Sequence, residues 1–210
     1  RNKNNHSPLL LLIIITSFIN PFLGAAINIA LPTIGNEFSL SATGLSWVAM
    51  SFLLSSAIFL VPLGKLADII GRKRIFLIGN IIIAISSLAC ALSPSGEFLI
   101  ILRGIQGLGS AMVFGTGIAI ITSAYPPNKR GKAIGIVVTS VYIGLSLAPF
   151  IGGFLTEYLG WRSNFYLTIP FELFVILGTW IFVKDEWADA KGETFDYRGS
   201  FIYVISMFAF

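Results

Sequence analysis

The chain has 210 residues, of which 55% are hydrophobic and 11% are charged, and its mean hydropathy is +0.85. Soluble domains carry about a quarter charged residues, so this composition predicts a protein that is solvated by lipid. The formal charge of +4 comes from short basic clusters between apolar runs, a pattern that excludes a nucleic-acid-binding face.

The reactive residues of the chain are few. Cys90 is the one cysteine and His6 the one histidine, so we expect no disulfide, no metal site and no cofactor. The chain also lacks a Gly-x4-Gly-Lys-Ser/Thr loop for ATP phosphates. It begins without Met and stops at Phe210 inside an apolar run, and we therefore expect the N-terminal part of a longer protein.

Six apolar runs are long enough to cross a bilayer, which takes about 20 residues for each helix. In chain order they occupy residues 9–34, 47–66, 75–92, 98–124, 133–158 and 165–183. We predict an all-α membrane protein with a polar tail at 1–8 and a six-helix bundle over 9–183. A linker at 184–199 then leads to the start of a seventh helix at 200–210.

The basic residues predict the orientation of these spans. They lie in the N-terminal tail and after the second, fourth and sixth spans, whereas the opposite loops hold only Arg162. Because Lys and Arg are enriched in cytoplasmic loops, the N-terminus is expected in the cytoplasm. We predict a multi-pass protein of the inner or plasma membrane.

The densest charge lies in residues 64–74, between the second and third spans. Two glycines, Gly64 and Gly71, are expected to permit close helix contact and a sharp turn. A helical continuation would pair Asp68 with Arg72, four residues apart. A role in fixing the orientation of the spans would explain the cations of this segment but would not require Asp68. We therefore expect this segment to form a conformational gate. Its residues are Gly64, Asp68, Gly71, Arg72, Lys73 and Arg74.

Residues 153–162 repeat the pattern of residues 64–74. Both read Gly-x-Leu-small-acid-x-aliphatic-Gly-x-base, and they lie three spans apart. An odd number of spans places the two copies on opposite sides of the membrane. The pattern therefore predicts inverted three-helix repeats over about 9–92 and 98–183, as in many secondary transporters.

Polar residues within the spans are the candidates for function. Arg103 either faces a cavity with Gln106 beside it or extends to the nearby interface. Glu172 is a candidate proton site, although it could equally reach the interface or pair with a neighbouring helix. Asn20 and Asn28 are expected to hydrogen-bond either a substrate or an adjacent helix.

The fifth span carries a face of small residues. Gly144, Ala148 and Gly152 recur every four residues, which lets another helix approach closely. Gly153 adjoins this face, and Pro149 is expected to bend the helix.

Several motifs resemble those of one family. Residues 64–74 resemble the signature loop of the major facilitator superfamily, and residues 102–111 look like the fourth-helix motif of its drug/proton antiporters. Residues 144–153 are similar to the fifth-helix antiporter motif that marks exporters. Asn-Ile-Ala-Leu-Pro at 28–32 and Gly-Trp-Arg at 160–162 resemble elements of the fourteen-helix multidrug-efflux branch.

The resemblance implies two six-helix bundles around a central cavity, with alternating access driven by protons. It implies that Asp68 faces a helix end of the C-terminal half and that Arg103 takes part in proton coupling. It also implies that Pro149 and its glycines form a tightly packed helix that limits leak.

One position departs from the branch, which usually has an acid five residues before Asn28. Leu23 stands there, with Asn20 one turn earlier. Coupling must then use another acid, either Glu172 or one in the C-terminal half.

We therefore predict a secondary active transporter that exports drug-like compounds, lipophilic and often cationic, in exchange for protons. A facilitator-fold importer or metabolite exporter is the alternative, and a membrane-embedded enzyme or sensor is a different class. Arg103 and Glu172 are the ionisable residues within the spans, which does not provide a nucleophile–base set, so we predict no enzyme. The expected partners are the bilayer, a small molecule, protons and the C-terminal half.

Overall fold

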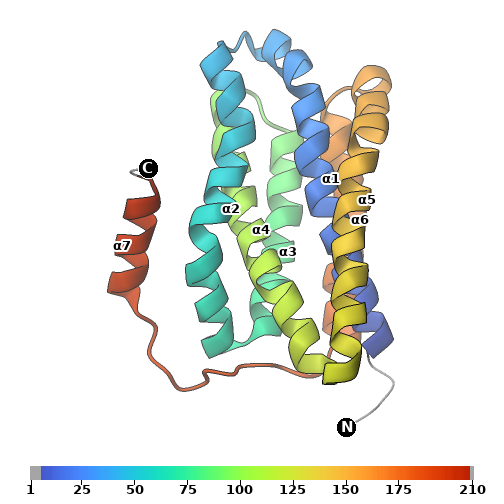
Figure 1. Cartoon of the computed structure of the whole chain (residues 1–210). Coiled ribbons are helices and arrows are strands. Elements are labelled where there is room, and N and C mark those ends of the chain that lie inside the picture. The colour runs from blue at the N-terminus through green and yellow to red at the C-terminus, as the bar shows by residue number, and fades with distance from the viewer. Residues whose placement is uncertain (1–5, 209–210) are drawn as a thin grey trace.

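A computed structural model describes residues 6–208, and these residues form helices joined by short connections. The helices are α1 (His6–Phe38), α2 (Ala42–Ile70), α3 (Arg72–Ala91), α4 (Gly96–Ala124), α5 (Pro127–Leu159), α6 (Arg162–Phe182) and α7 (Tyr197–Phe208). Within this part of the chain, six helices are long and apolar enough to cross a membrane. The predicted all-α membrane fold, with six spans followed by a seventh helix, is confirmed (Figure 1).

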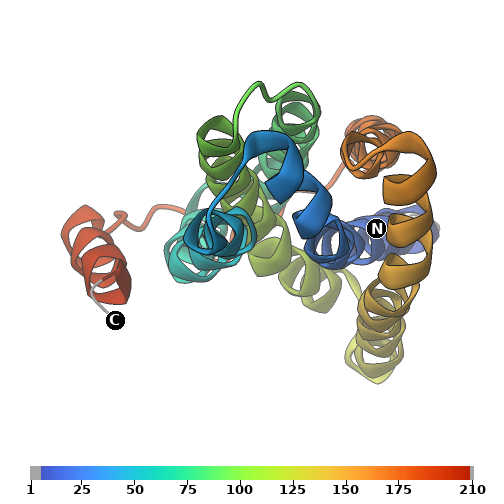
Figure 2. The same ribbon diagram turned by 90° about the horizontal axis from the view of Figure 1, so that it is seen from above.

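The helices pair in a pattern that an inverted repeat predicts. The most extensive contacts join α2 to α4 and α1 to α5, and α3 packs against both α4 and α6. Exchanging the first three helices for the last three converts the α1–α5 pair into the α4–α2 pair. Figure 2, which looks down the bundle, shows α1 and α5 on one side and α2 and α4 on the other.

Close helix approach depends on glycines at the contacts. A Cβ at Gly107 of α4 would collide with the Phe52 carbonyl oxygen of α2. A Cβ at Gly79 of α3 would lie 2.8 Å from the Gly109 carbonyl oxygen of α4. Because a real Cβ cannot come so near, these glycines fix how closely α2 and α3 flank α4.

The helices are longer than the apolar runs from which they were predicted. Residues 64–70 continue α2, and α5 begins at Pro127, between the predicted fourth and fifth spans at 98–124 and 133–158. Helical hydrogen bonding does not need lipid, and Lys, Arg and Glu are good helix formers. Proline fits the first turn of a helix because the N–H that it lacks would have no partner there. Helices α1, α2, α4 and α5, with 29 to 33 residues each, are therefore longer than the about 20 residues that cross a bilayer.

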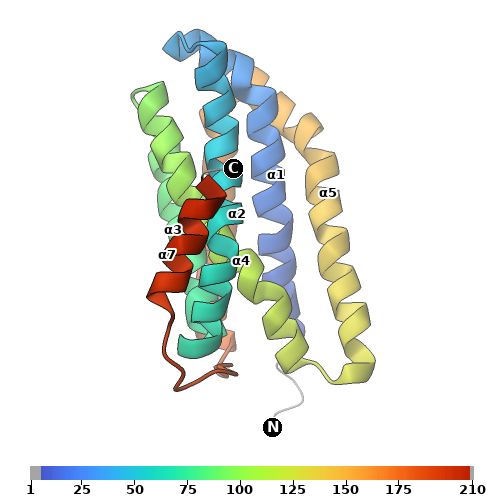
Figure 3. The same ribbon diagram turned by 60° about the vertical axis from the view of Figure 1, so that its left-hand side comes forward.

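The segment that follows α6 crosses one end of the bundle. It runs from the end of α6 past the α2–α3 junction and then leads into α7 (Figure 3). Helix α7 contacts α2, but none of its described residues is buried. This path brings the linker, residues 184–199, against the 64–74 segment.

Candidate functional site

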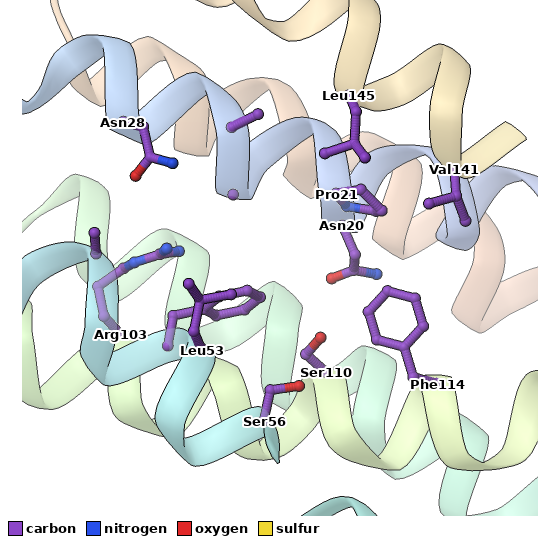
Figure 4. Close-up of a pocket in the computed structure, with 14 residues that line it drawn as sticks. Asn20, Pro21, Asn28, Leu53, Ser56, Arg103, Ser110, Phe114, Val141 and Leu145 are labelled. Carbon is purple, nitrogen blue, oxygen red and sulfur yellow. The ribbon is translucent and has the colours of Figure 1, made fainter.

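A cavity of about 340 Å³ lies between α1 and α5 on one side and α2 and α4 on the other (Figure 4). Most of its wall is apolar, with a few amides and hydroxyls. Its lining residues are Asn20, Pro21, Gly24, Ala25, Asn28, Ala49, Phe52, Leu53, Ser56, Arg103, Ser110, Phe114, Val141 and Leu145. Three residues singled out from the sequence, Asn20, Asn28 and Arg103, therefore line one cavity.

Arg103 faces the cavity and does not extend to the interface. The residue is 1% exposed. Its Nε donates to the Val48 carbonyl oxygen at 3.3 Å and its Nη1 to Gln106 Oε1 at 2.6 Å. The guanidinium carbon lies 4.4 Å from the centroid of the Phe52 ring, in a cation–π arrangement. Of the two alternatives for Arg103, the cavity-facing one is correct.

Gln106 supports Arg103 and is not one of the residues that line this cavity. It is fully buried, and its Nε2 donates to Ser87 Oγ of α3 at 2.7 Å. The expected proximity of Gln106 to Arg103 is confirmed, but its place in the cavity wall is not. The reason is packing: α3 lies against α4, and Gln106 bonds Ser87 of α3 where α3 covers it.

A chain of polar side chains connects Asn20 to the core of the bundle. Asn20 Nδ2 donates to Thr16 Oγ1 at 3.1 Å and is 3.5 Å from Glu172 Oε1 of α6. Thr16 Oγ1 in turn donates to Asn80 Oδ1 of α3 at 2.9 Å. Asn20 therefore bonds an adjacent helix, which is one of the two alternatives, and it also borders the cavity. A hydrogen bond from Asn20 to a substrate stays a prediction.

Glu172 is fully buried against α1 and does not reach the interface. Its Oε1 accepts from Asn20, while its Oε2 has no hydrogen-bond partner among residues 6–208. A buried carboxyl with one free oxygen is poorly compensated as an anion. Asn20 lies between Glu172 and the cavity, because it contacts the carboxyl and also lines the cavity.

The small-residue face of α5 packs against α1, as predicted. A Cβ at Gly144 would collide with the Phe18 carbonyl oxygen, and one at Gly152 would lie 2.5 Å from Ala26 Cβ. Ala148, between them, is fully buried. Gly153 is outside this close contact, since a Cβ there would be 3.8 Å from its nearest neighbour.

Pro149 is on the exposed side of α5, and the helix runs from Pro127 to Leu159 without interruption. Pro149 therefore does not end the helix, and the bend expected at this position stays a prediction.

The 64–74 segment is helical except for Gly71, whose φ of 124° only glycine adopts readily. As predicted, Arg72 Nη2 pairs with Asp68 Oδ1 at 2.7 Å. The same side chain donates to Ser123 Oγ of α4 at 2.5 Å. A Cβ at Gly64 would have no described atom within 4 Å, but the Gly64 Cα lies 3.6 Å from the position of a Cβ on Gly115 of α4, which agrees with the close helix contact expected there. The sharp turn falls at Gly71, because α2 continues past Gly64 as a regular helix.

Acidic residues of the linker, which the sequence analysis did not single out, bind this segment. Asp189 Oδ2 lies 2.7 Å from Arg72 Nη2, and Glu193 Oε2 lies 2.6 Å from Lys65 Nζ. Glu186 accepts from the Lys73 backbone N–H at 2.8 Å and is 3.8 Å from Arg74 Nε. The mixed charge of the linker was the available signal, but no spacing rule joins it to residues more than a hundred positions earlier.

The opposite end of the bundle has its own ion pair. Arg162 contacts both carboxylate oxygens of Glu37, at 2.8 and 2.7 Å, and Trp161 Nε1 donates to the same carboxylate at 2.7 Å. Arg162 therefore joins the start of α6 to the end of α1. Its partner is Glu37 and not the acid of the repeated pattern, Glu157, which is exposed.

Paired apolar helices, a buried guanidinium at a cavity and intramembrane amides together define one bundle of a multi-span membrane transporter. Residues 13–206 match the profile of the Major Facilitator Superfamily, and the chain belongs to this family. Its resemblance to that family is thereby confirmed, and the family is one of transporters, not enzymes.

Similar proteins carry names of drug and metabolite transporters. The chain is 37% identical over 188 residues to the multidrug resistance protein Stp of Mycobacterium tuberculosis, covering 89% of this chain and 35% of that protein. It is 32% identical to the riboflavin transporter RibZ of Clostridioides difficile, covering 92% and 42%. It is 30% identical to the tetracenomycin C resistance and export protein of Streptomyces glaucescens, covering 87% and 34%. The chain thus spans between a third and a half of the length of these relatives.

A solved structure shows the same fold. The bacterial homologue of the human lysosomal transporter Spinster, in an inward-facing and unoccupied conformation, superposes with a TM-score of 0.74 at 24% identity. The match covers 94% of this chain and 47% of that chain.

Proposed function

We propose that this chain is the N-terminal bundle of a secondary transporter that exports drug-like compounds. The observation that carries the proposal is the cavity between the α1–α5 and α2–α4 pairs, whose apolar wall with a few polar groups is typical of a small-molecule site. Similarity to proteins named for multidrug resistance and tetracenomycin export supports it. The similarity to a riboflavin transporter favours the second candidate, an importer or exporter of a metabolite.

We propose that a C-terminal bundle completes the cavity and contacts Asp68. The share of each relative that this chain covers supports a longer protein. The side chain of Asp68 is 35% exposed although it pairs with Arg72, so one side of its carboxylate is open to a further partner.

Proton coupling is assigned to Glu172 and Arg103. A neutral Glu172 carboxyl both donates and accepts, whereas its anion only accepts. Asn20, which touches Glu172 and lines the cavity, would respond to that change. We place the protein in the inner or plasma membrane with the 64–74 segment and the linker in the cytoplasm, as the distribution of basic residues favours.

Everted membrane vesicles that contain the full-length protein test the export function. Energised vesicles should accumulate a fluorescent drug from a panel, and a protonophore should abolish that accumulation. Vesicles without the protein provide the control. If no compound of the panel accumulates, and right-side-out vesicles take up riboflavin instead, the second candidate replaces the first. Accumulation that persists with the protonophore would contradict the proposed proton coupling but not the proposed export.

A further inference from the structure

The wall of the cavity is electrostatically one-sided. Arg103 is the one charged residue among the described residues that line it. The other polar members are amides and hydroxyls: Asn20, Asn28, Ser56 and Ser110. A single positive charge on a largely apolar wall creates a positive potential that water does not screen fully.

Within the described part of the chain, Arg103 has no anionic partner. Its hydrogen bonds go to a backbone carbonyl of α2 and to the amide of Gln106. No carboxylate among residues 6–208 lies within 4 Å of the guanidinium, and its Nη2 makes no hydrogen bond there. A buried cation is normally paired with an anion, so the charge and the Nη2 donors of this guanidinium are available to an anionic ligand.

Glu172, the buried carboxyl of the bundle, does not act as the anionic partner of Arg103. Glu172 is buried between α6 and α1, where its Oε1 meets Asn20, and it is not one of the residues that line the cavity. Leu23 of α1 is also absent from the wall and packs in the core with Ile27 and Trp161. The described wall therefore offers nothing that would neutralise a cationic compound.

We propose that this cavity selects compounds that carry an anionic group, such as a carboxylate, on a flat apolar frame. The anion would lie against Arg103 Nη2, and the frame would contact Phe52, Phe114 and Leu145, which line the same cavity. The inference rests on the proposed export function, since it assigns the substrate class of that site. It replaces the expectation of cationic compounds with one of anionic compounds.

Two dyes with the same ring system and opposite charge test the inference. Fluorescein is anionic and carries a carboxylate, whereas rhodamine 123 is cationic and has a methyl ester at that position. Fluorescence anisotropy of the purified full-length protein measures binding without any need for coupling. One charge-assisted hydrogen bond predicts that fluorescein binds roughly ten- to a hundredfold more tightly than rhodamine 123.

Variants assign the preference to Arg103. Arg103→Gln should remove the difference between the two dyes, and Arg103→Lys should retain part of it. Arg130→Gln, a matched substitution outside the cavity, should bind both dyes as the parent does. Ser56→Asp keeps Arg103 and adds a carboxylate to the wall, so it should weaken fluorescein and strengthen rhodamine 123 even if Arg103→Gln fails to fold.

The outcomes separate this inference from the export function. Equal or tighter binding of rhodamine 123 by the parent would overturn the inference. A fluorescein preference that survives Arg103→Gln would also overturn it, because another cation would then hold the anion. If the preference is absent because an acid from the rest of the protein already pairs with Arg103, Arg103→Gln would leave that acid unpaired and strengthen the binding of rhodamine 123, which contradicts the inference as well. In each case the vesicle assay above still reports on export.

Discussion

At the scale of single residues, two ionisable side chains occupy the middle of the bundle and differ in their surroundings. Arg103 is solvated by a carbonyl, an amide and an aromatic face, and it borders the cavity. Glu172 has one amide contact at 3.5 Å and an unpartnered oxygen. The first environment holds a charge in place, whereas the second leaves the anion poorly stabilised. Glu172 is the one of the two that we propose to exchange a proton, whereas Arg103 keeps its charge and contributes to the proposed coupling and ligand contact through that charge.

Glu172→Gln tests the proposed proton site in the full-length protein. The amide keeps the shape of the side chain but cannot exchange a proton, so drug efflux should no longer respond to an imposed pH gradient. Efflux measured in vesicles over a range of internal and external pH checks this expectation. Glu157→Gln is the control, because Glu157 is an exposed carboxylate on α5. A pH profile that matches the parent's would exclude Glu172 as the coupling site.

At the scale of elements, the contact between α1 and α5 depends on the absence of side chains. Gly144 and Gly152 bring the α5 backbone against Phe18 and Ala26 of α1. Attraction between helices in lipid comes largely from such close packing, since lipid is as apolar as the side chains. The contact also forms the α1–α5 side of the cavity.

Gly144→Val should therefore separate α1 from α5. The added side chain would collide with the Phe18 backbone, and overpacking of this kind costs about 1–3 kcal/mol. The thermal unfolding midpoint of the purified protein should fall accordingly. Gly153→Ala provides a control on the same helix, since its Cβ would find its nearest neighbour at 3.8 Å. Equal midpoints for the two variants would contradict the packing role of Gly144.

The linker is the second element whose position depends on a few contacts. Arg72 holds Asp189 through its side chain, and its backbone N–H donates to the Trp187 carbonyl oxygen at 2.8 Å. The Ala190 N–H of the linker donates a second backbone hydrogen bond, to the Asp68 carbonyl oxygen of α2, at 3.0 Å. The Asp189 side chain is 67% exposed, so water screens this ion pair and its contribution is modest.

Asp189→Asn should loosen the linker without disturbing the spans, because Arg72 keeps its contacts with Asp68 and Ser123. Loss of a partly exposed pair is worth about 1 kcal/mol, so amide exchange at Ala190 should accelerate about fivefold. Hydrogen–deuterium exchange of the full-length protein measures this rate. Arg74→Gln is the control, because the Arg74 side chain is 72% exposed and its ion pair with Glu186 is long, at 3.8 Å. Protection at Ala190 that is the same in both variants would show that the backbone contacts hold the linker alone.

At the scale of the whole molecule, the sequence predicted the spans and the contacts between residues of the same helix region, but not the contacts between residues far apart in the chain. Apolar run length gave the six spans, and helical spacing gave the pairs Asp68–Arg72 and Arg103–Gln106. The Asn20–Glu172 contact was not predictable, because 152 positions separate the two residues and only the packing of α6 on α1 joins them. The same holds for Glu37 with Arg162, which neither run length nor spacing relates.

The direction in which the chain crosses the membrane remains a prediction at this scale. The bundle has one end with Gly71, Arg130 and the linker, and another end where Glu37 meets Arg162. The excess of Lys and Arg at the first end predicts that this end lies in the cytoplasm. Labelling of introduced cysteines tests this orientation, and the chain is suited to it because Cys90 is fully buried.

We expect Lys132→Cys, at the start of α5, to react with a membrane-impermeant maleimide only after the cells are opened. Glu157→Cys, at the other end of the same helix, should react in intact cells. Both native side chains are exposed, so accessibility to water does not distinguish them and only the side of the membrane does. Any cysteine outside this chain is replaced first, and the parent with Cys90 alone sets the background. Reaction of Lys132→Cys in intact cells with protection of Glu157→Cys would invert the orientation. The linker and the Asp68–Arg72 pair would then lie outside the cell.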